Sequence, residues 1–422
     1  MLRKATLVLV FLCVYVLKSA HGQEHCQSTP QELSIDELQA RVDSLQSELI
    51  ALKRSDTGTD DSPAMRKAEE RLLSASEQLE CRKESATLNP KGILTTATFV
   101  QIPLLYVTDR QRKTGKRGVY DYTTEANTAL EFGKVNAVIN EIGSIRTGLI
   151  GGTTRVPAPG SLGEAQVRQA QLLSEQAFMK MLTTPRSNHE PFRILLFVHG
   201  FNVEFYEAAL STARLATSMQ IPLVPVFYSW PSEGKVLGYW HDEDEIPAAV
   251  VRFQPFLEQL LSMPNSEVII VCHSMGARIV ARALGELARK DAKLQSLKNV
   301  VFAAADINVE ELNAEWPYLR QVPSVQWASY ESSGDFALRL STYIHRFRRV
   351  GESDGSVYVQ EGMNTIDASS TTSLMRTFGH SYIVSSPSLA ADIGDWVAQD
   401  LPPAKRGLQR EKQGKDVYWK FP

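Results

Sequence analysis

The stretch VIIVCHSMGARIVARAL, residues 268–284, places a strand-like run directly before a helix-like run. Residues 268–271 are β-branched and apolar, which is typical of a strand buried on both faces. After Met275 the apolar positions recur at helical spacing. Ser274 stands at the joint, where a tight turn would push its hydroxyl out above a sheet and the helix start would add positive potential. The stretch therefore predicts a strand–turn–helix unit with Ser274 as a candidate nucleophile.

The five residues Cys272–Gly276 match the pattern G-x-S-x-G, except that Cys272 replaces the first glycine. Cysteine is small enough to leave the turn possible. In this motif the backbone N–H that follows the serine, here that of Met275, faces the oxyanion of an acyl-transfer reaction. The alternative is that Ser274 merely caps the helix that begins at Met275.

A second strand-like run, ILLFVHGFN at residues 194–202, ends in His-Gly. An oxyanion hole needs a second backbone N–H from a loop that follows an earlier strand, and His-Gly-x is the usual form of that loop. We expect Gly200 to allow a close backbone approach, Phe201 to supply the N–H, and Asn202 to hold the loop. A plain glycine turn after a strand is the alternative.

Two histidines follow Ser274 in the chain, His345 and His380. In folds with this elbow the chain order is nucleophile, acid, histidine. His345 lies in YIHRFRR, where a surface histidine on a helix is the simplest interpretation. His380 lies in RTFGHSYI, a polar loop between the last expected strand and the last expected helix, and is therefore the candidate general base.

Two aspartates compete for the acid. Asp306 ends the strand-like run VVFAAAD, and Asp335 follows the next one in WASYESSGD. The acid of this fold usually follows the penultimate strand, which favours Asp335. Asp306 is the alternative acid, unless it caps a short helix that begins near Val309.

From residue 91 onward strand-like and helix-like segments alternate, which indicates a mostly parallel sheet with helices on both faces. Active sites of such sheets form at the carboxyl ends of the strands. We therefore expect residues 91–422 to form one α/β domain of this kind. The expected strands are 102–108, 194–198, 223–228, 268–272, 300–305, 325–330 and 357–366, and the expected helices are 164–182, 204–219, 247–261, 275–288 and 388–397.

The first 90 residues differ in character. Residues 1–22 combine Arg3 and Lys4 with an apolar run and a small-residue site after Gly22, as in a secretory signal peptide. An uncleaved membrane anchor is the alternative. Residues 23–90 contain two helical patterns joined by a polar loop, which predicts an antiparallel coiled-coil hairpin. Their seam positions are 35, 38, 42, 45, 49 and 52 in the first helix and 65, 68, 72, 75 and 79 in the second.

Removal of the signal peptide would leave three cysteines in an oxidising compartment. The hairpin brings the end of its second helix, with Cys81, back toward Cys26, so we expect a disulfide between them. Two free thiols are the alternative. Cys272 lies in the expected buried strand and is interpreted as a thiol of the core.

The composition is that of an ordinary globular protein. Charged residues make up 22% of the chain and the net charge is −3, so no electrostatic feature indicates a nucleic-acid partner. The run HDEDE, residues 241–245, is interpreted as a solvated acidic face rather than a metal site. In the basic tail, residues 405–420, we expect Tyr418 and Trp419 to dock on the domain. No metal or cofactor is expected.

Several stretches resemble a known family, the mostly bacterial α/β-hydrolase-fold proteins described only as esterase- or lipase-like. The resemblance extends from about residue 100 to the end of the chain and leaves out the hairpin. It implies Ser274, Asp335 and His380 as a catalytic triad, without a defined substrate. The stretches are LLYVTDRQR, LLFVHGFNVEFYEAA, FYSWPSEGKVLGY, VCHSMGARIVARAL, SSGDFALRLS, TIDAS, GHSYI and VYW.

The sequence thus predicts a secreted or periplasmic serine hydrolase that cleaves carboxylic esters, with Phe201 and Met275 forming the oxyanion hole. Its expected partner is a small-molecule acyl substrate, and the only expected flap is residues 231–247. Three alternatives remain open. The same triad serves peptidases, amidases and acyltransferases. The protein could instead be a binding module that uses the hairpin for a protein partner or a homo-oligomer. An uncleaved N-terminal segment would make it a membrane-associated scaffold.

Overall fold

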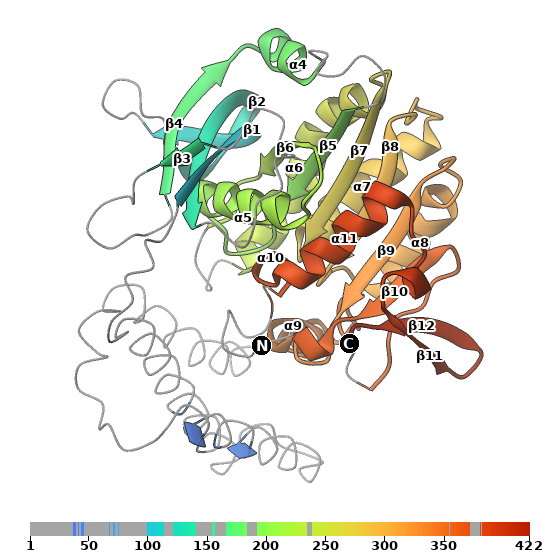
Figure 1. The fold of residues 1–422 in the computed structure, drawn as a ribbon. Helices are drawn as coiled ribbons and strands as arrows, with labels where there is room; N and C mark the ends of the chain where they lie inside the picture. Colours follow the sequence, from blue (N-terminus) through green and yellow to red (C-terminus); the bar gives the residue numbers. More distant parts are fainter. Residues whose placement is uncertain are drawn as a thin grey trace. The chain divides into compact units, whose positions relative to one another are not determined.

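The computed structural model divides the chain into two units, Met1–Thr96 and Ala97–Pro422. In the first unit it describes a few positions between Glu37 and Ala75. In the second it describes residues 99–113, 121–140, 154–156, 166–183, 192–233, 239–353, 355–371, 380 and 382–422 (Figure 1).

Twelve strands in the described part of the second unit form one sheet. Its order is β11-β12-β10-β9-β8-β7-β5-β6-β1-β2-β4, and β3 pairs with β1. Neighbouring strands are parallel throughout the run β12-β10-β9-β8-β7-β5-β6-β1. The pairs β1–β2, β1–β3, β2–β4 and β11–β12 are antiparallel. The strands are β1 Phe99–Lys113, β2 Asp121–Asn140, β3 Thr154–Val156, β4 Gln166–Leu173, β5 Phe192–Val198, β6 Val224–Ser229, β7 Ser266–His273, β8 Leu297–Ala303, β9 Gln326–Glu331, β10 Met363–Asp367, β11 Gln409–Gln413 and β12 Asp416–Lys420.

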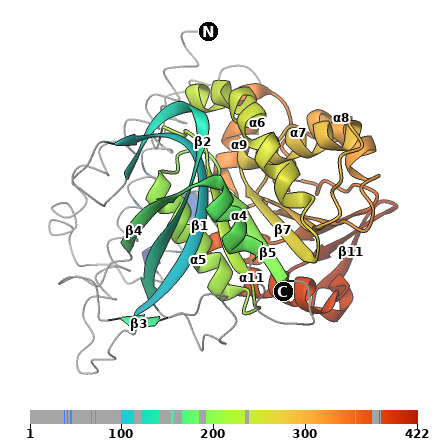
Figure 2. The same ribbon diagram turned by 90° about the horizontal axis from the view of Figure 1, so that it is seen from above.

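Helices cover both faces of this sheet, as Figures 1 and 2 show. Apolar side chains of α4, α6, α7 and α8 form one core cluster with one face, and those of α5, α10 and α11 form a second cluster with the other. Along β7, Val268 and Ile270 point into the first cluster while Ile269 and Val271 point into the second. The helices are α4 Glu175–Thr183, α5 Phe205–Ser218, α6 Tyr239–Leu261, α7 Gly276–Arg289, α8 Val309–Leu319, α9 Phe336–His345, α10 Tyr382–Ser385 and α11 Pro387–Gln399, with short 3₁₀ turns at Ser369–Thr371 and Pro403–Lys405.

Three expected elements are wrong. The helix expected over residues 164–182 is a strand over Gln166–Leu173 followed by α4, because pairing with β2 overrides the helix-forming residues of this stretch. The strand expected over 357–366 begins only at Met363. The helix expected from Pro247 begins at Tyr239, so much of the flap expected over residues 231–247 is the start of α6.

The basic tail forms the hairpin β11–β12, and β12 extends the sheet beside β10. Trp419 packs against the second core cluster, in agreement with the expected docking of this aromatic side chain.

The described positions of the first unit are helical, and three expected seam residues, Leu38, Leu45 and Ala75, are buried. The pairing of the two helices, the signal peptide over residues 1–22, Cys26 and Cys81 lie outside the described residues. The hairpin and its disulfide therefore stay predictions. Among the residues that the structure describes, no helix has both the length and the hydropathy that crossing a bilayer requires.

Candidate active site

Ser274 lies between the end of β7 and the start of α7, at the carboxyl edge of the sheet. Its φ angle of 53° is in the left-handed region, which a non-glycine residue adopts only when its surroundings enforce it. Its N–H donates to the carbonyl of Ala303 (3.1 Å), and its carbonyl accepts from the N–H groups of Asp306 (3.1 Å) and Ala277 (3.0 Å). The backbone thus holds Ser274 in the strained geometry of a nucleophile elbow.

The His-Gly loop after β5 lies directly against this elbow. A Cβ atom on Gly276 would stand 2.5 Å from the His199 carbonyl oxygen, and a Cβ atom on Gly200 would stand 2.5 Å from the Cβ of Ser274. Both positions therefore require glycine for the close approach of two backbones. The peptide that links Gly200 to Phe201 therefore begins beside the Ser274 side chain, and the supply of an oxyanion N–H by Phe201 stays a prediction.

Replacing Gly200 with alanine is expected to lower kcat for an activated ester by about 10²-fold, because the new methyl group must push this loop, with the Phe201 N–H that we expect to bind the oxyanion, away from Ser274. Turnover and a melting curve measure the effect. Gly285→Ala on α7 is the matched control, since its methyl group meets the flexible end of Glu315 and alanine favours the helix. Equal turnover in both variants would contradict the placement of the loop.

The structure brings Asp335 and His380 together. Asp335 is the N-cap of α9, and its Oδ1 accepts from the Leu338 N–H (3.0 Å) while its Oδ2 lies 2.7 Å from His380 Nδ1. Because a carboxylate only accepts, Nδ1 of His380 carries the proton, and Nε2 of the neutral ring is left with its lone pair. Asp335 is fully buried, so this orientation is fixed.

His380 also contacts the residue before the elbow. Its backbone carbonyl accepts from His273 Nε2 (2.9 Å), and the two imidazole rings lie 4.8 Å apart. Burial, aided by the nearby His380, lowers the pKa of His273 to about 3, so His273 is a neutral donor. Through this contact the backbone of the candidate base is anchored to the residue that precedes Ser274.

Burial lowers the pKa of His380, but the charge and hydrogen bond of Asp335 outweigh it, so the pKa of His380 lies above its ordinary value. The imidazolium is therefore stabilised, as a base that accepts a proton during the reaction requires.

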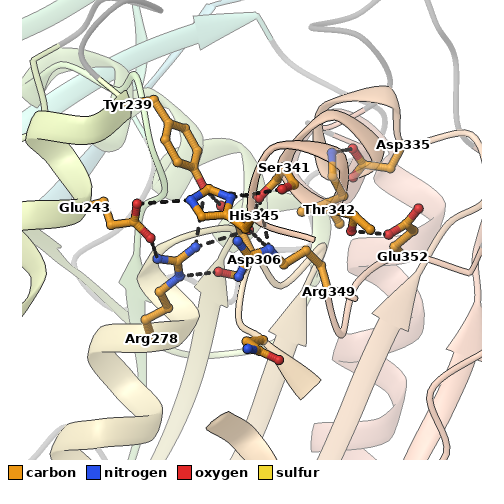
Figure 3. A network of polar contacts seen from close by, with 12 residues as sticks. Tyr239, Glu243, Arg278, Asp306, Asp335, Ser341, Thr342, His345, Arg349 and Glu352 are labelled. Atoms are coloured by element: carbon orange, nitrogen blue, oxygen red, sulfur yellow. Dashed lines mark hydrogen bonds and ion pairs between the residues drawn. The ribbon is translucent and has the colours of Figure 1, made fainter. Parts of the chain in front are cut away.

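Asp306 lies at the centre of a buried polar network (Figure 3). Its carboxylate accepts hydrogen bonds from the hydroxyls of Tyr239 (2.7 Å) and Ser341 (2.8 Å). The guanidinium groups of Arg349 (3.1 Å) and Arg278 (3.4 Å) pair with the same carboxylate. Burial raises the pKa of Asp306, but these two arginines and the two hydroxyls outweigh it and hold the pKa below its ordinary value.

The helix-capping alternative for Asp306 is wrong. The N-cap of α8 is Asn308, whose side chain accepts from the Glu310 N–H (3.0 Å). His345 also differs from its interpretation as a surface residue. It ends α9 and lies between the Ser341 carbonyl (2.9 Å) and Glu243 (3.1 Å), inside the same network.

The interpretation of residues 241–245 as a solvated acidic face holds only in part, since His241 and Asp244 are exposed but Asp242 is not. Asp242 is fully buried and accepts hydrogen bonds from the Ser232 hydroxyl (2.5 Å) and from the N–H groups of Glu233 (2.8 Å) and Asn202 (3.4 Å). Burial raises its pKa to about 6. Asp242 thereby connects the start of α6 to the loop that contains Phe201, a role that no local pattern in the sequence indicates.

Cys272 is buried, its thiol donates to the Val301 carbonyl (3.3 Å), and burial raises its pKa, as expected of a thiol in the core. Within the described part of the chain, no group of three or more His, Cys, Asp or Glu side chains is arranged to hold a metal ion.

Comparison with known proteins agrees with this architecture. The alpha/beta-hydrolase family of unknown function DUF900 matches residues 174–395, more than half of the chain. The chain belongs to this family. The match confirms the α/β-hydrolase fold class and the resemblance to hydrolases of unassigned substrate.

Other similarities are more distant. An uncharacterized protein of Nostoc sp. is 28% identical over an alignment of 169 residues, which covers 33% of this chain and only 39% of that relative. An esterase from the fungus Rhizomucor miehei is 11% identical, with a TM-score of 0.30, and the match covers 89% of this chain and 100% of the esterase chain. A fluorophosphonate-binding serine hydrolase of Staphylococcus aureus is 11% identical, with a TM-score of 0.25, over 69% of this chain and 99% of its own.

Proposed function

We propose that the protein is a serine hydrolase that cleaves carboxylic esters through an acyl-enzyme intermediate. The observation that carries the proposal is the buried Asp335–His380 pair, with 2.7 Å between Oδ2 and Nδ1, anchored through His273 beside the Ser274 elbow. A membership in the α/β-hydrolase family supports hydrolysis in general. The triad, the ester substrate and the export of the protein are the finer parts of the proposal.

In the proposed reaction the Ser274 hydroxyl attacks the acyl carbonyl while Nε2 of His380 takes its proton. The positive charge that forms on His380 is stabilised by Asp335, which also keeps the proton of the ring on Nδ1. The N–H groups of Phe201 and Met275 bind the oxyanion, and the start of α7 adds positive potential. The imidazolium then protonates the leaving alcohol, and an activated water molecule releases the acid.

Small or medium esters are the proposed substrates. Between β8 and β9 the chain forms only α8, eleven residues long, so no large cap domain is inserted at this edge of the sheet. An edge without a cap domain between β8 and β9 suits substrates that do not need to be enclosed. Long-chain lipids, in contrast, require an apolar cavity that buries most of the acyl chain.

The test combines a fluorophosphonate with a substrate panel. The wild-type protein is expected to gain the mass of one adduct, on Ser274, because the elbow and base activate this hydroxyl. It is also expected to hydrolyse activated esters faster than matched amides and thioesters. Faster cleavage of amides would instead indicate a peptidase or amidase. A protein that neither takes up the adduct nor cleaves any member of the panel would contradict the proposal and favour a binding module.

A further inference from the structure

Arg110 is an almost fully buried cation next to the loop after β5, with 1% of its surface exposed. A guanidinium has five N–H groups and no acceptor. Here each N–H has a partner within hydrogen-bonding distance, and no carboxylate is among them. The partners are Ser229 Oγ (2.9 Å), the carbonyls of Thr123 (3.3 Å), Ser232 (3.0 Å) and Val203 (2.6 Å), and His199 Nε2 (3.5 Å).

These contacts determine which ring nitrogen of His199 carries the proton. The guanidinium of Arg110 can only donate, so Nε2 of His199 accepts from it. The other nitrogen, Nδ1, lies 2.8 Å from the carbonyl oxygen of Gly200, which can only accept. The imidazole is therefore neutral with its proton on Nδ1, and burial together with the charge of Arg110 lowers its pKa well below the ordinary value. Stacking on Trp230, with 9° between the ring planes, fixes the ring.

The hydrogen bond from His199 to the Gly200 carbonyl also orients the N–H group of the next residue, Phe201. The Gly200 carbonyl and the Phe201 N–H belong to one planar trans peptide, so they point in opposite directions. Holding the carbonyl toward His199 therefore turns the N–H of Phe201 away from it. This is the peptide that the close approach of Gly200 places beside the Ser274 side chain.

We propose that Arg110 is a positioning residue of the oxyanion hole: acting through His199, it orients the Gly200–Phe201 peptide so that the Phe201 N–H faces the reacting carbonyl. Arg110 touches no substrate and takes part in no proton transfer. It also binds the Val203 carbonyl and so holds the far end of the same loop. The inference rests on the proposed function, because an oxyanion forms only if Ser274 attacks an acyl group.

Two substitutions of His199 separate this role from packing alone. Asparagine places an amide N–H where Nδ1 stands and so keeps a donor for Gly200, whereas glutamine places its amide at the Nε2 end, toward Arg110, and leaves the Gly200 carbonyl without that donor. His199→Gln is expected to lower kcat for an activated ester about 10²-fold further than His199→Asn, with KM nearly equal in both. A purely structural His199 would give both variants the same kcat.

Arg110→Met tests the contact of Arg110 with His199; we call the series of contacts from Arg110 through His199 to the Gly200 carbonyl the relay. It is expected to lower kcat about 10²-fold, because His199 is then free to move its proton to Nε2 and release the Gly200 carbonyl. Arg193→Met is the matched control: it removes an arginine paired with Glu267 (3.0 Å) at the opposite end of β5, and its kcat is expected to stay unchanged. If Arg110→Met does not fold, the His199 pair still decides.

The outcomes separate the relay from the proposed function. An active wild-type protein whose Asn and Gln variants at His199 share one kcat would overturn the relay alone. A wild-type protein without esterase activity and without fluorophosphonate uptake would overturn the proposed function and the relay with it.

Discussion

Ser274→Ala is expected to lower the turnover of an activated ester by about 10⁶-fold, because loss of a triad nucleophile leaves only the catalysis that binding and the oxyanion hole supply. The fold should remain, since the elbow is held by backbone hydrogen bonds to Ala303, Asp306 and Ala277 that do not involve the hydroxyl. Alanine, like serine, has a Cβ atom, so the left-handed φ of 53° at this position strains both residues to the same extent. The thermal midpoint is therefore expected to change little.

Three measurements check this expectation: kcat, the intact mass after fluorophosphonate treatment, and a melting curve. Ser266→Ala is a matched control, because Ser266 is a buried serine at the opposite end of β7, hydrogen-bonded to Ser296 (3.0 Å). It should keep full turnover and full labelling. A Ser274→Ala protein that still takes up the adduct would show that another nucleophile reacts and would refute the triad.

The elbow and the His-Gly loop could be predicted because their geometry is encoded within a few residues. The β-branched run indicates the strand, and the small Ser274 stands at the turn that follows it. Glycines are needed at 200 and 276 because two backbones approach each other closely there. The central strands were predicted for the same reason, since burial on both faces leaves an apolar run that can be read without knowledge of the neighbours.

Elements whose identity depends on distant pairing could not be predicted. Residues 166–173, QVRQAQLL, favour a helix by composition, and only hydrogen bonds to β2 make them a strand. From the sequence alone, the start of α6 is predicted to be a polar flap, because the charged residues Asp242 and Glu243 are expected to be exposed to solvent. Their partners, Ser232 for the first and Arg278 for the second, come from other segments.

The two aspartates also differ in their side-chain partners. Both follow parallel strands, and position alone favours Asp335 without explaining Asp306. In the structure Arg278 on α7 and Arg349 after α9 pair with the Asp306 carboxylate, whereas Oδ2 of Asp335 contacts His380, which supports Asp335 as the proposed acid. The role of Arg110 was missed in the same way, because its contact with His199 spans 89 positions of the chain.

Asp335→Asn is expected to lower kcat by about 10⁴-fold, the loss that this change causes in a serine protease triad. An asparagine can present its N–H to Nδ1 of His380, which would place the ring proton on Nε2 and remove the base. The change also removes the main charge that raises the pKa of His380, and burial, which outweighs the remaining effect of Asp306, then lowers that pKa. The fall of kcat/KM on the acid side should therefore move to lower pH. A pH profile of residual turnover measures the shift.

Asp306→Asn is the contrasting variant, and its main expected effect is on stability. It leaves the buried Arg349 without its carboxylate at 3.1 Å, and it removes one of the two carboxylates of Arg278, at 3.4 Å, while Glu243 remains. Breaking a buried ion pair in this way costs about 3–5 kcal/mol. The melting temperature should fall well below that of Asp335→Asn, while kcat, measured where both proteins are folded, should fall much less than 10⁴-fold. Because Asp306 also raises the pKa of His380, a smaller acid-side shift in the same direction is expected. An inactive Asp306→Asn protein beside an active Asp335→Asn protein would place the acid one strand earlier.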